Sequence, residues 1–535
     1  MAAVSVLRGK IPLFVPALIL FAGGIRGLDR GSMWQDEATT AVIASRSLPQ
    51  LWHTLGSVDA VHGAYYVLVH ELIVVLGGAV PLEVLIRIPS LLAAAAAAAG
   101  VAAVARAAWS PAAGLLSGSV FAVLPVVSRY AQEGRSYALV AAAVIWGTYF
   151  LVRGRWVGYA IALAVACLLN LFAVFVVPAH AVALLLGRAG APAFRRWALA
   201  VLAGLTPAVP VAWVAAHQTA QVSWLTRPGW PDVRALLTGW AGGTLPLAAL
   251  GVLCAAGVAV GLAGLLPRRR PFLSPEEGPP ARQLLLAGAG GPQRAWPVGG
   301  SGAGGPGARD AGFAGFGKRP DEGTALVPLP ALALAVAVLP PAALLAVSQF
   351  HPLYQDRYVL YATAGLAWLA GAALAALRKG AVVVAAALVI ALGAFTLPAQ
   401  QQVRQVSSRA DDPAAAARVV ADGARKGDAV IFLPSVRRLV AEAYPECFSG
   451  VRDVALMSSG AQSGTLAGRE IKAGQVAGAL KGVDRVWVVS RSYARSADLT
   501  APTDRAKRHE LRKQFTQTRI TRVLGYAVRL YVRKT

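Results

Sequence analysis

The run IPLFVPALILFAGGIRGL, residues 11–28, is apolar enough and long enough to cross the ~30 Å hydrocarbon core of a bilayer as a helix. Similar runs recur along most of the first 400 positions. They must be helices, because only helices and closed barrels pair all backbone polar groups within a bilayer, and the alternating pattern of a barrel is missing. Arg8 and Lys10 precede the first run as in a signal peptide, but no convincing cleavage site follows. The sequence therefore predicts an α-helical polytopic membrane protein with an uncleaved first span.

Composition supports this class and argues against others. The chain is 56% hydrophobic and only 14% charged, whereas soluble domains carry about 25% charged residues. Its net charge of +25 is of the kind that the positive-inside rule and anionic lipid headgroups produce in a multispan protein. No basic stripe with interleaved aromatic residues occurs, so we expect no nucleic-acid partner. The three cysteines, Cys167, Cys254 and Cys447, are far apart and predict neither a disulfide framework nor a metal cluster.

Basic residues indicate how the chain threads the plasma membrane. Arg8 and Lys10 place the N-terminus in the cytoplasm. The segment HGAYYVLVHELIVVLGG, residues 62–78, has only about 15 mostly apolar residues, interrupted by His70 and Glu71, so we interpret it as an interfacial or re-entrant helix. With that choice the basic clusters between spans all face the cytoplasm: Arg106, Arg153 and Arg155, Arg188, Arg195 and Arg196, Arg268 to Arg270, and Arg378 and Lys379.

About eleven spans are then expected. They cover residues 11–28, 88–105, 111–127, 137–152, 156–169, 171–187, 197–216, 246–266, 326–347, 358–377 and 380–398, with a bent pair near Asn170. An odd number of crossings places the C-terminus outside.

Four parts of the chain follow from this reading. Residues 1–267 form an N-terminal transmembrane core, with a first outer loop at 29–87, and residues 326–399 supply the remaining spans. Residues 268–325 are rich in Gly, Pro and Ala without periodicity, which indicates a disordered cytoplasmic insertion. Residues 400–535 lose the long apolar runs and alternate helical with short β-rich stretches, such as DAVIFLP, VRDVALM and DRVWVVS. This last part is expected to be a small extracytoplasmic α/β domain.

Two adjacent acids stand out in the first outer loop. The stretch SMWQDEATT, residues 32–40, contains Asp36 and Glu37. One carboxylate of such a pair can take a proton from an attacking hydroxyl while its neighbour orients it or holds a cation. Alternatively, the two acids simply begin a surface helix, where they suit the helix dipole. Two carboxylates permit a divalent cation, but no further ligands indicate one, so no cofactor and no metal site are predicted.

A second outer loop reads SRYAQEGRSYAL, residues 128–139. Here Glu133 and Tyr137 share a helix face at i, i+4, and Arg135 lies between them at the mouth of a span. The alternative is an interfacial belt in which Arg and Tyr anchor a helix end.

A third outer loop, SQFHPLYQDRYVLY at 348–361, crowds five polar residues into eight positions: His351, Tyr354, Asp356, Arg357 and Tyr358. The planar guanidinium of Arg357 suits a phosphate. Membrane anchoring explains the tyrosines, but explains a His, an Asp and an Arg together less well.

Carboxylates and phosphate-seeking arginines on one membrane face fit a substrate that is part lipid and part anion, such as a polyprenyl-phosphate sugar. Inverting transfer from such a donor needs a base near the acceptor hydroxyl and positive charge on the departing phosphate.

At these motifs the chain resembles a known family, the multispan lipid-linked-sugar glycosyltransferases with the GT-C fold, of the family 39, protein O-mannosyltransferase or aminoarabinose-transferase type. The resemblance covers about residues 1–400, and its carriers are WQDEATT, HGAYYVLVHELI, YAQEGRSYAL and HPLYQDRYVLY. Each motif is short, and their order and common side make the combination specific.

The resemblance implies roles for these residues. Asp36 would be the base for the acceptor, with Glu37 beside it as part of the catalytic pair. The donor side would comprise Glu133, Arg135 and Tyr137 from the second loop and Asp356, Arg357 and Tyr358 from the third, where His351 is a further donor-binding candidate. Relatives often carry a His-Pro-Pro-Leu-like stretch where this chain has only VHGAYY, so no role is assigned to His62.

The function predicted is transfer of a sugar from a polyprenyl-phosphate donor to an extracytoplasmic glycan, lipid or protein. Alanine- and arginine-rich usage suggests a high-GC bacterium, and mannose is expected on that ground only. Two rival readings stay open. A lipid-sugar transporter or flippase would show internal repeats and midplane charges, which the sequence lacks, and a non-catalytic membrane assembly factor would use the C-terminal domain to bind a partner.

Overall fold

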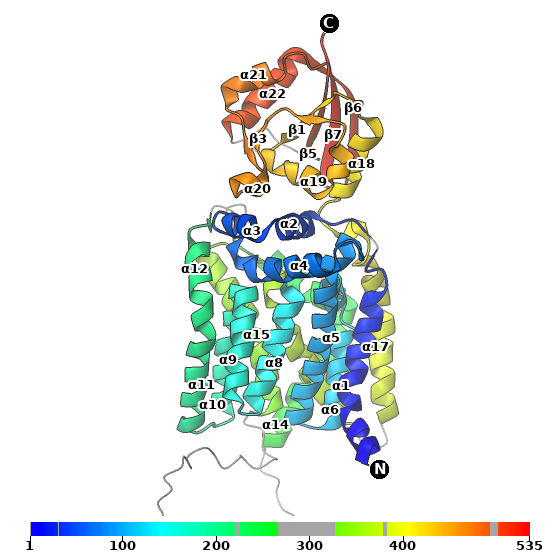
Figure 1. The fold of residues 1–535 in the computed structure, drawn as a ribbon. Coiled ribbons are helices and arrows are strands. Elements are labelled where there is room, and N and C mark those ends of the chain that lie inside the picture. The colour runs from blue at the N-terminus through cyan, green and yellow to red at the C-terminus, as the bar shows by residue number, and fades with distance from the viewer. Residues whose placement is uncertain (1, 30, 220–224, 266–326, 378–381, 493–500) are drawn as a thin grey trace, which may run out of the picture. The chain divides into compact units, whose positions relative to one another are not determined.

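The computed structural model describes residues 2–29, 31–219, 225–265, 327–377, 382–492 and 501–535. Figure 1 shows a bundle of long helices and, at one end of it, a domain built around a sheet. The helices of the bundle are α1 (Ala2–Ile25), α5 (Leu82–Ala108), α6 (Pro111–Ala122), α7 (Pro125–Ala131), α8 (Tyr137–Val152), α9 (Trp156–Leu169), η2 (Leu171–Phe175), α10 (Val176–Leu186), α11 (Ala191–Leu205), η3 (Thr206–Ala208), α12 (Val209–Ala216), α13 (Trp230–Ala241), α14 (Thr244–Leu265), α15 (Leu329–Phe350), η5 (Asp356–Ala362), α16 (Thr363–Ala375) and α17 (Val382–Gln402).

Six helical stretches of the described residues are long and apolar enough to cross a membrane, and the pair α6–α7, bent by 69°, makes up to seven. The other expected spans coincide with shorter apolar helices at 12–25, 137–152, 156–169 and 171–186. The predicted polytopic helical class is therefore confirmed, while the count of eleven crossings stays an expectation. The insertion predicted at 268–325 lies outside the described residues.

One boundary was predicted too late in the chain. The first outer loop was expected to end at residue 87, but α5 already begins at Leu82. Arg87 therefore lies inside a helix, one and a half turns from its start. Pro81 directly precedes α5, where its missing N–H costs the helix no hydrogen bond.

Small residues let α6 and α16 pack closely. A Cβ added at Gly371 of α16 would lie 2.0 Å from the Oγ of Ser117 in α6 and 2.6 Å from the backbone nitrogen of Ser117. No atom of the described residues lies within 4 Å of the corresponding position at Gly251 of α14. Close backbone approach of this kind is a main source of helix association in membranes.

This contact yields a stability prediction. Gly371→Ala is expected to destabilise the bundle by about 1–3 kcal/mol, the usual cost of overpacking, and to lower the thermal unfolding midpoint of the protein in detergent. Gly251→Ala is the matched control and should leave the midpoint unchanged. Equal midpoints for the two variants would contradict the packing described here.

Three helices of the first outer loop cross the end of the bundle that carries the sheet domain. They are α2 (Gln35–Ala44), α3 (Leu48–Leu55) and α4 (Gly63–Leu76), with the short η1 (Ala60–His62) before α4. Figure 1 shows α2, α3 and α4 lying crosswise to the long helices, between the bundle and the sheet domain. The segment at 62–78 thus runs crosswise, as predicted for an interfacial helix.

The C-terminal part is the predicted α/β domain. Its five-stranded sheet has the order β2-β1-β5-β7-β6, in which β1 is parallel to β2 and β5, and β7 is antiparallel to β5 and β6. The strands are β1 (Ala429–Leu433), β2 (Arg452–Asp453), β5 (Arg485–Arg491), β6 (Phe515–Val523) and β7 (Tyr526–Arg533), with a separate pair β3 (Leu456–Ser458) and β4 (Arg469–Glu470). The helical elements of this part are η6 (Val406–Ser408), α18 (Pro413–Gly423), η7 (Ser435–Arg438), α19 (Leu439–Ala443), η8 (Pro445–Phe448), α20 (Gly460–Ser463), η9 (Ala473–Gln475), α21 (Val476–Ala479) and α22 (Pro502–Gln514).

Strand β1, which lies between β2 and β5, is buried along its whole length. Val430 and Phe432 belong to one hydrophobic cluster, whereas Ala429, Ile431 and Leu433 belong to another. Successive side chains of a strand point to opposite faces, so both faces of the sheet are covered. This explains why the strand reads as the continuous apolar run AVIFL instead of an alternating one.

Candidate active site

The site is built around the first turn of α2. Trp34, with extended backbone, directly precedes the helix. The backbone N–H of Trp34 donates to the carboxylate of Glu37 at 3.4 Å. This closes half of a capping box, in which the acid three residues into the helix satisfies the N–H before it. Asp36 and Glu37 therefore leave the same helical turn in different directions.

Glu37 lies in a closed ion pair. Its side chain is fully buried, and Nε and Nη2 of Arg87 donate to its two oxygens at 2.8 Å each. The N–H of Gly134 adds a further hydrogen bond of 2.8 Å. Burial opposes ionisation of Glu37, but the hydrogen bonds and charge of Arg87 outweigh it and hold the pKa below its ordinary value. Glu37 thus ties α2 to α5 and to the loop before α8.

Asp36 faces a different neighbour and keeps contact with solvent. Its side chain is 26% exposed, and Nη2 of Arg357 donates to Oδ2 of Asp36 at 3.3 Å. The guanidinium of Arg357 also lies over the rings of Trp34, at 5.7 Å, and Tyr137, at 5.5 Å. The structure thus brings together two predicted site residues, Asp36 and Arg357, that are 321 positions apart.

Arg135 forms the second cationic part of the site. It is buried, and its Nη1 donates to the hydroxyl of Tyr66 at 2.8 Å and lies 3.8 Å from Oδ2 of Asp59. The hydroxyl of Tyr66 donates to the same carboxylate of Asp59. We call the five residues Asp36, Asp59, Tyr66, Arg135 and Arg357 the polar cluster.

Each arginine of the polar cluster keeps an unused donor. The Nε atoms of Arg135 and Arg357 are buried without a hydrogen-bond partner among the described residues. Buried polar groups are normally paired, so such an orphaned donor on a cation indicates that an acceptor is missing. An oxyanion is the acceptor that a guanidinium prefers.

The sequence reasoning assigned no role to Asp59, His62 or Tyr66. All three lie in SVDAVHGAYY, where an Asp, a His and a Tyr recur at spacings of three and four residues, and this spacing was the available signal. His62 is buried with its Nε2 3.9 Å from Asp59. Burial and the charge of Arg135 lower the pKa of His62 to about 3, so it is neutral at physiological pH.

Aromatic rings border the polar cluster. The ring of Tyr137 lies 6.2 Å from that of Tyr358 and 5.6 Å from that of Tyr130. Tyr358 stacks on Phe172 with the ring centroids 4.6 Å apart. The tyrosines predicted at 137 and 358 therefore contribute to one aromatic wall beside Arg357.

Three other predicted donor-binding residues lie differently. Glu133 is buried and accepts from Nη1 of Arg409 at 2.6 Å, while its Oε1 has no partner in the described ranges. Burial raises the pKa of Glu133 above its ordinary value, against the opposing charge of Arg409. Asp356 is exposed and accepts the backbone N–H of Arg357 at 2.8 Å. His351 is exposed directly after the end of α15, and within the described ranges its side chain forms no hydrogen bond to the polar cluster.

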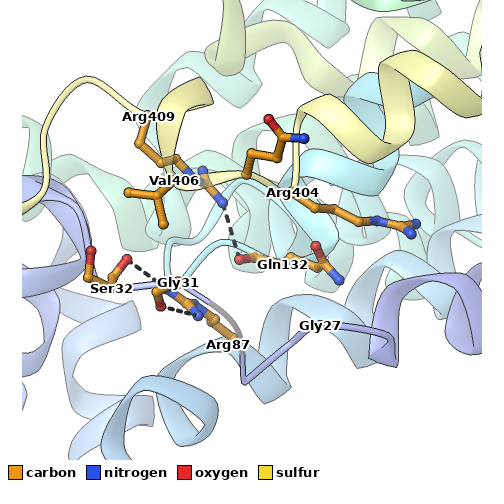
Figure 2. Close-up of a pocket in the computed structure, with 9 residues that line it drawn as sticks. Gly27, Gly31, Ser32, Arg87, Gln132, Arg404, Val406 and Arg409 are labelled. Atoms are coloured by element: carbon orange, nitrogen blue, oxygen red, sulfur yellow. Dashed lines mark hydrogen bonds between the residues drawn. The ribbon is translucent and has the colours of Figure 1, made fainter. Parts of the chain in front are cut away.

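Arg87 and Arg409, the partners of the two buried acids, line a separate small hollow that is partly open to solvent (Figure 2). Its other lining residues are Gly27, Gly31, Ser32, Gln132, Arg404, Gln405 and Val406. Figure 2 shows Arg87 and Arg409 donating to backbone carbonyls of this lining, those of Gly31 and Gln132 among them. Asp36 and Arg357 are not part of the lining, so the hollow is distinct from the polar cluster.

In the described part of the chain, no three His, Cys, Asp or Glu side chains are grouped so that they could bind a metal ion. The polar cluster places the carboxylates of Asp36 and Asp59 and the hydroxyl of Tyr66 beside two guanidinium groups.

Known proteins resemble this chain in structure but not detectably in sequence. No protein-family model and no curated protein matches it. The crystal structure of ArnT from Cupriavidus metallidurans in the apo state aligns with a TM-score of 0.56 and 12% sequence identity, over 99% of this chain and 98% of ArnT. The fold is that of ArnT.

A second crystal structure, of the same ArnT bound to undecaprenyl phosphate, aligns with a TM-score of 0.54 and 13% identity, over 97% of each chain. ArnT has the GT-C fold, so the predicted fold class, including the C-terminal α/β domain, is confirmed. At this level of identity the likeness to ArnT shows the fold alone.

Proposed function

We propose that this chain is an integral-membrane glycosyltransferase that moves a sugar, with inversion, from a polyprenyl-phosphate donor to an extracytoplasmic acceptor. The observation that carries the proposal is the 3.3 Å pairing of the partly exposed Asp36 with Arg357, beside a second buried arginine at the end of a transmembrane bundle. The ArnT whose fold the chain shares has been crystallised with undecaprenyl phosphate. Mannose is the candidate donor sugar.

In the proposed reaction, Asp36 is the base. The acceptor hydroxyl oxygen attacks the anomeric carbon of the sugar and forms the new glycosidic bond, while its proton passes to the carboxylate of Asp36. The bond between the anomeric carbon and the phosphate oxygen breaks, and polyprenyl phosphate leaves with the electron pair. Attack from the face opposite the leaving group inverts the anomeric configuration.

Arg357 and Arg135 are proposed to hold the donor phosphate. Among the described residues, the Nε of each has no hydrogen-bond partner. Charge-assisted bonds from a planar guanidinium to phosphate are strong and directional. Negative charge grows on the phosphate as the bond breaks, so these cations stabilise the transition state more than the bound donor. Arg357 binds Asp36 in the structure, and a donor phosphate that takes over Arg357 would free the carboxylate to act as a base.

Other site residues receive supporting roles. We propose that the rings of Tyr137 and Tyr358 line the donor beside Arg357. Glu37 holds α2 in place through Arg87 and does not meet the substrate. Glu133 balances the charge of Arg409. The carboxylate of Asp356 accepts the backbone N–H of Arg357 and helps to fix that residue. Among the described residues no contact of His351 supports donor binding.

The orientation proposed has the N-terminus in the cytoplasm of the cell and the polar cluster outside, at the plasma membrane. The basic clusters between α8 and α9, at Arg153 and Arg155, and between α10 and α11 support it. In Figure 1 these connections lie at the end of the bundle opposite the C-terminal domain.

The role of Arg357 gives a kinetic prediction. Arg357→Gln should raise the donor KM and lower transfer by about 10- to 150-fold overall, since hydrogen bonds to charged groups contribute about 1.5–3 kcal/mol. Arg357→Lys keeps the positive charge but lacks the planar, two-donor geometry of the guanidinium, so it should restore only part of the lost transfer. The measurement is transfer from radiolabelled polyprenyl-phosphate mannose into membranes of a strain that lacks this chain. Wild-type kinetics in Arg357→Gln would contradict the role of Arg357 in donor binding.

The same preparation separates the proposal from lipid-sugar transport. In proteoliposomes, a glycosyltransferase converts the labelled donor to a new covalent product and free polyprenyl phosphate. A flippase would move the intact donor across the bilayer without any product, and that result would refute the proposed function.

A further inference from the structure

The segment that leads into α2 is bound by the C-terminal domain. The N–H of Gln35, the residue before Asp36, donates to Oδ1 of Asp411 at 2.8 Å. Asp411 is buried, with 6% of its surface exposed, and lies between α17 and α18, 376 positions from Gln35. The first N–H groups of a helix have no partner within the helix itself. Here one of them is bonded by an acid from a distant part of the chain, near the helix end that favours negative charge.

Arg437 of η7 binds the side chain of Gln35. Its Nη1 donates to Oε1 of Gln35 at 2.9 Å and lies 3.7 Å from Oδ2 of Asp411. The guanidinium also lies over the ring of Tyr526, at 5.2 Å, so its own position is fixed by β7. The backbone and the side chain of Gln35 are therefore both held by one charged pair of the C-terminal domain.

Docking of this domain does not depend on that pair alone. Arg46, which follows α2, binds Glu442 of α19 at 3.1 Å. Arg409 binds Glu133 at 2.6 Å, and the hydroxyl of Tyr444 accepts the N–H of Met33 at 3.3 Å. Removing the carboxylate of Asp411 should therefore loosen the start of α2 while the domain remains docked.

We propose that Asp411, held by Arg437, is a positioning residue for Asp36. By fixing Gln35 it sets the first turn of α2, so that the Asp36 carboxylate meets Arg357 and the incoming acceptor hydroxyl. The C-terminal domain thereby completes the active site without touching the substrate. This inference rests on the proposed function.

The test compares two acids of the C-terminal domain, Asp411 and Glu442, each bonded to the first outer loop. Asp411→Ala should lower kcat by about 10- to 100-fold with a donor KM within about twofold of wild type, since misplacing a catalytic group by about 1 Å costs on the order of 100-fold. Asp411→Asn keeps an oxygen that can accept the Gln35 N–H and should recover most of kcat. Glu442→Gln, which weakens the contact with Arg46, should leave kcat unchanged.

Two measurements on every variant separate the outcomes. Sugar transfer is measured with radiolabelled polyprenyl-phosphate mannose as the donor, and the thermal unfolding midpoint shows how much of the protein is folded. Loss of kcat in Asp411→Ala beyond any loss of folded protein, absent from Glu442→Gln, supports the inference. Wild-type kcat in Asp411→Ala, or equal losses in Asp411→Ala and Glu442→Gln, overturns it. If Asp411→Ala does not fold, Arg437→Gln takes its place, with the same expected fall in kcat and the same contradicting result. Full activity of Asp36→Asn would instead refute the proposed function, independently of Asp411.

Discussion

Asp36→Asn is expected to lower sugar transfer by about 10²- to 10⁴-fold, the usual contribution of a general base. The amide has nearly the same shape as the carboxylate but cannot take the acceptor proton. Its loss should appear in kcat, because Asp36 acts on the acceptor and the donor phosphate is held by Arg357 and Arg135. Transfer from radiolabelled polyprenyl-phosphate mannose at saturating donor measures this directly.

The same variant should fold normally. The pair between Asp36 and Arg357 is partly exposed, at 26% and 18% of the two side chains, and such pairs contribute only about 0–1 kcal/mol. The thermal unfolding midpoint should therefore stay close to wild type. A large fall in the midpoint, with activity per folded molecule retained, would mean that Asp36 is structural and not the base.

Glu37→Gln should have the opposite signature. The change leaves Arg87 as a buried charge without its anion, and breaking a buried ion pair in this way costs about 3–5 kcal/mol. We expect a large drop in the thermal unfolding midpoint and in the yield of folded protein, whereas the folded remainder keeps much of its activity. Glu71→Gln, at an exposed acid on α4 in the same outer segment, is the control and should change neither quantity.

The pH dependence of this stabilisation follows from the pKa of Glu37. Because its folded-state pKa lies below the ordinary value of 4.5, the stabilisation is complete above that value and is lost as the pH falls through the lower folded-state pKa. As the pH falls below 4.5, unfolding midpoints should therefore drop more for wild type than for Glu37→Gln, whereas between neutral pH and 4.5 the Glu37 contribution should stay constant. Parallel pH profiles would contradict the ion pair as the source of stability.

The sequence predicts the bundle well because the bilayer imposes a simple rule. A helix must be apolar over most of its length to cross, so each expected span falls on an apolar helix of the structure. The short segment at 62–78, interrupted by His70 and Glu71, runs crosswise as expected. Strand β1 was also foreseeable, since a continuous apolar run bounded by Asp428 and Pro434 is typical of a buried strand.

The candidate site was predictable only in outline. Placing three loops on one side of the membrane brought Asp36 and Arg357 to the same surface, and the structure pairs them. Sequence alone could not separate Asp36 from Glu37, because the difference lies in Arg87, which was expected to be in a loop and instead points from α5 onto Glu37. The roles of Tyr66 and Asp411 depend on contacts between distant segments, and such contacts leave no local pattern.

The most direct test of the account uses purified protein, a polyprenyl-phosphate mannose labelled with ¹³C at the anomeric carbon, and membranes that supply the acceptor. We predict that wild type yields free polyprenyl phosphate and a new glycoside of inverted anomeric configuration, read by mass spectrometry and NMR. Asp36→Asn should bind the donor but give almost no glycoside. Glycoside formation by Asp36→Asn at the wild-type rate, or intact donor as the only species recovered with wild type, would contradict the central claim.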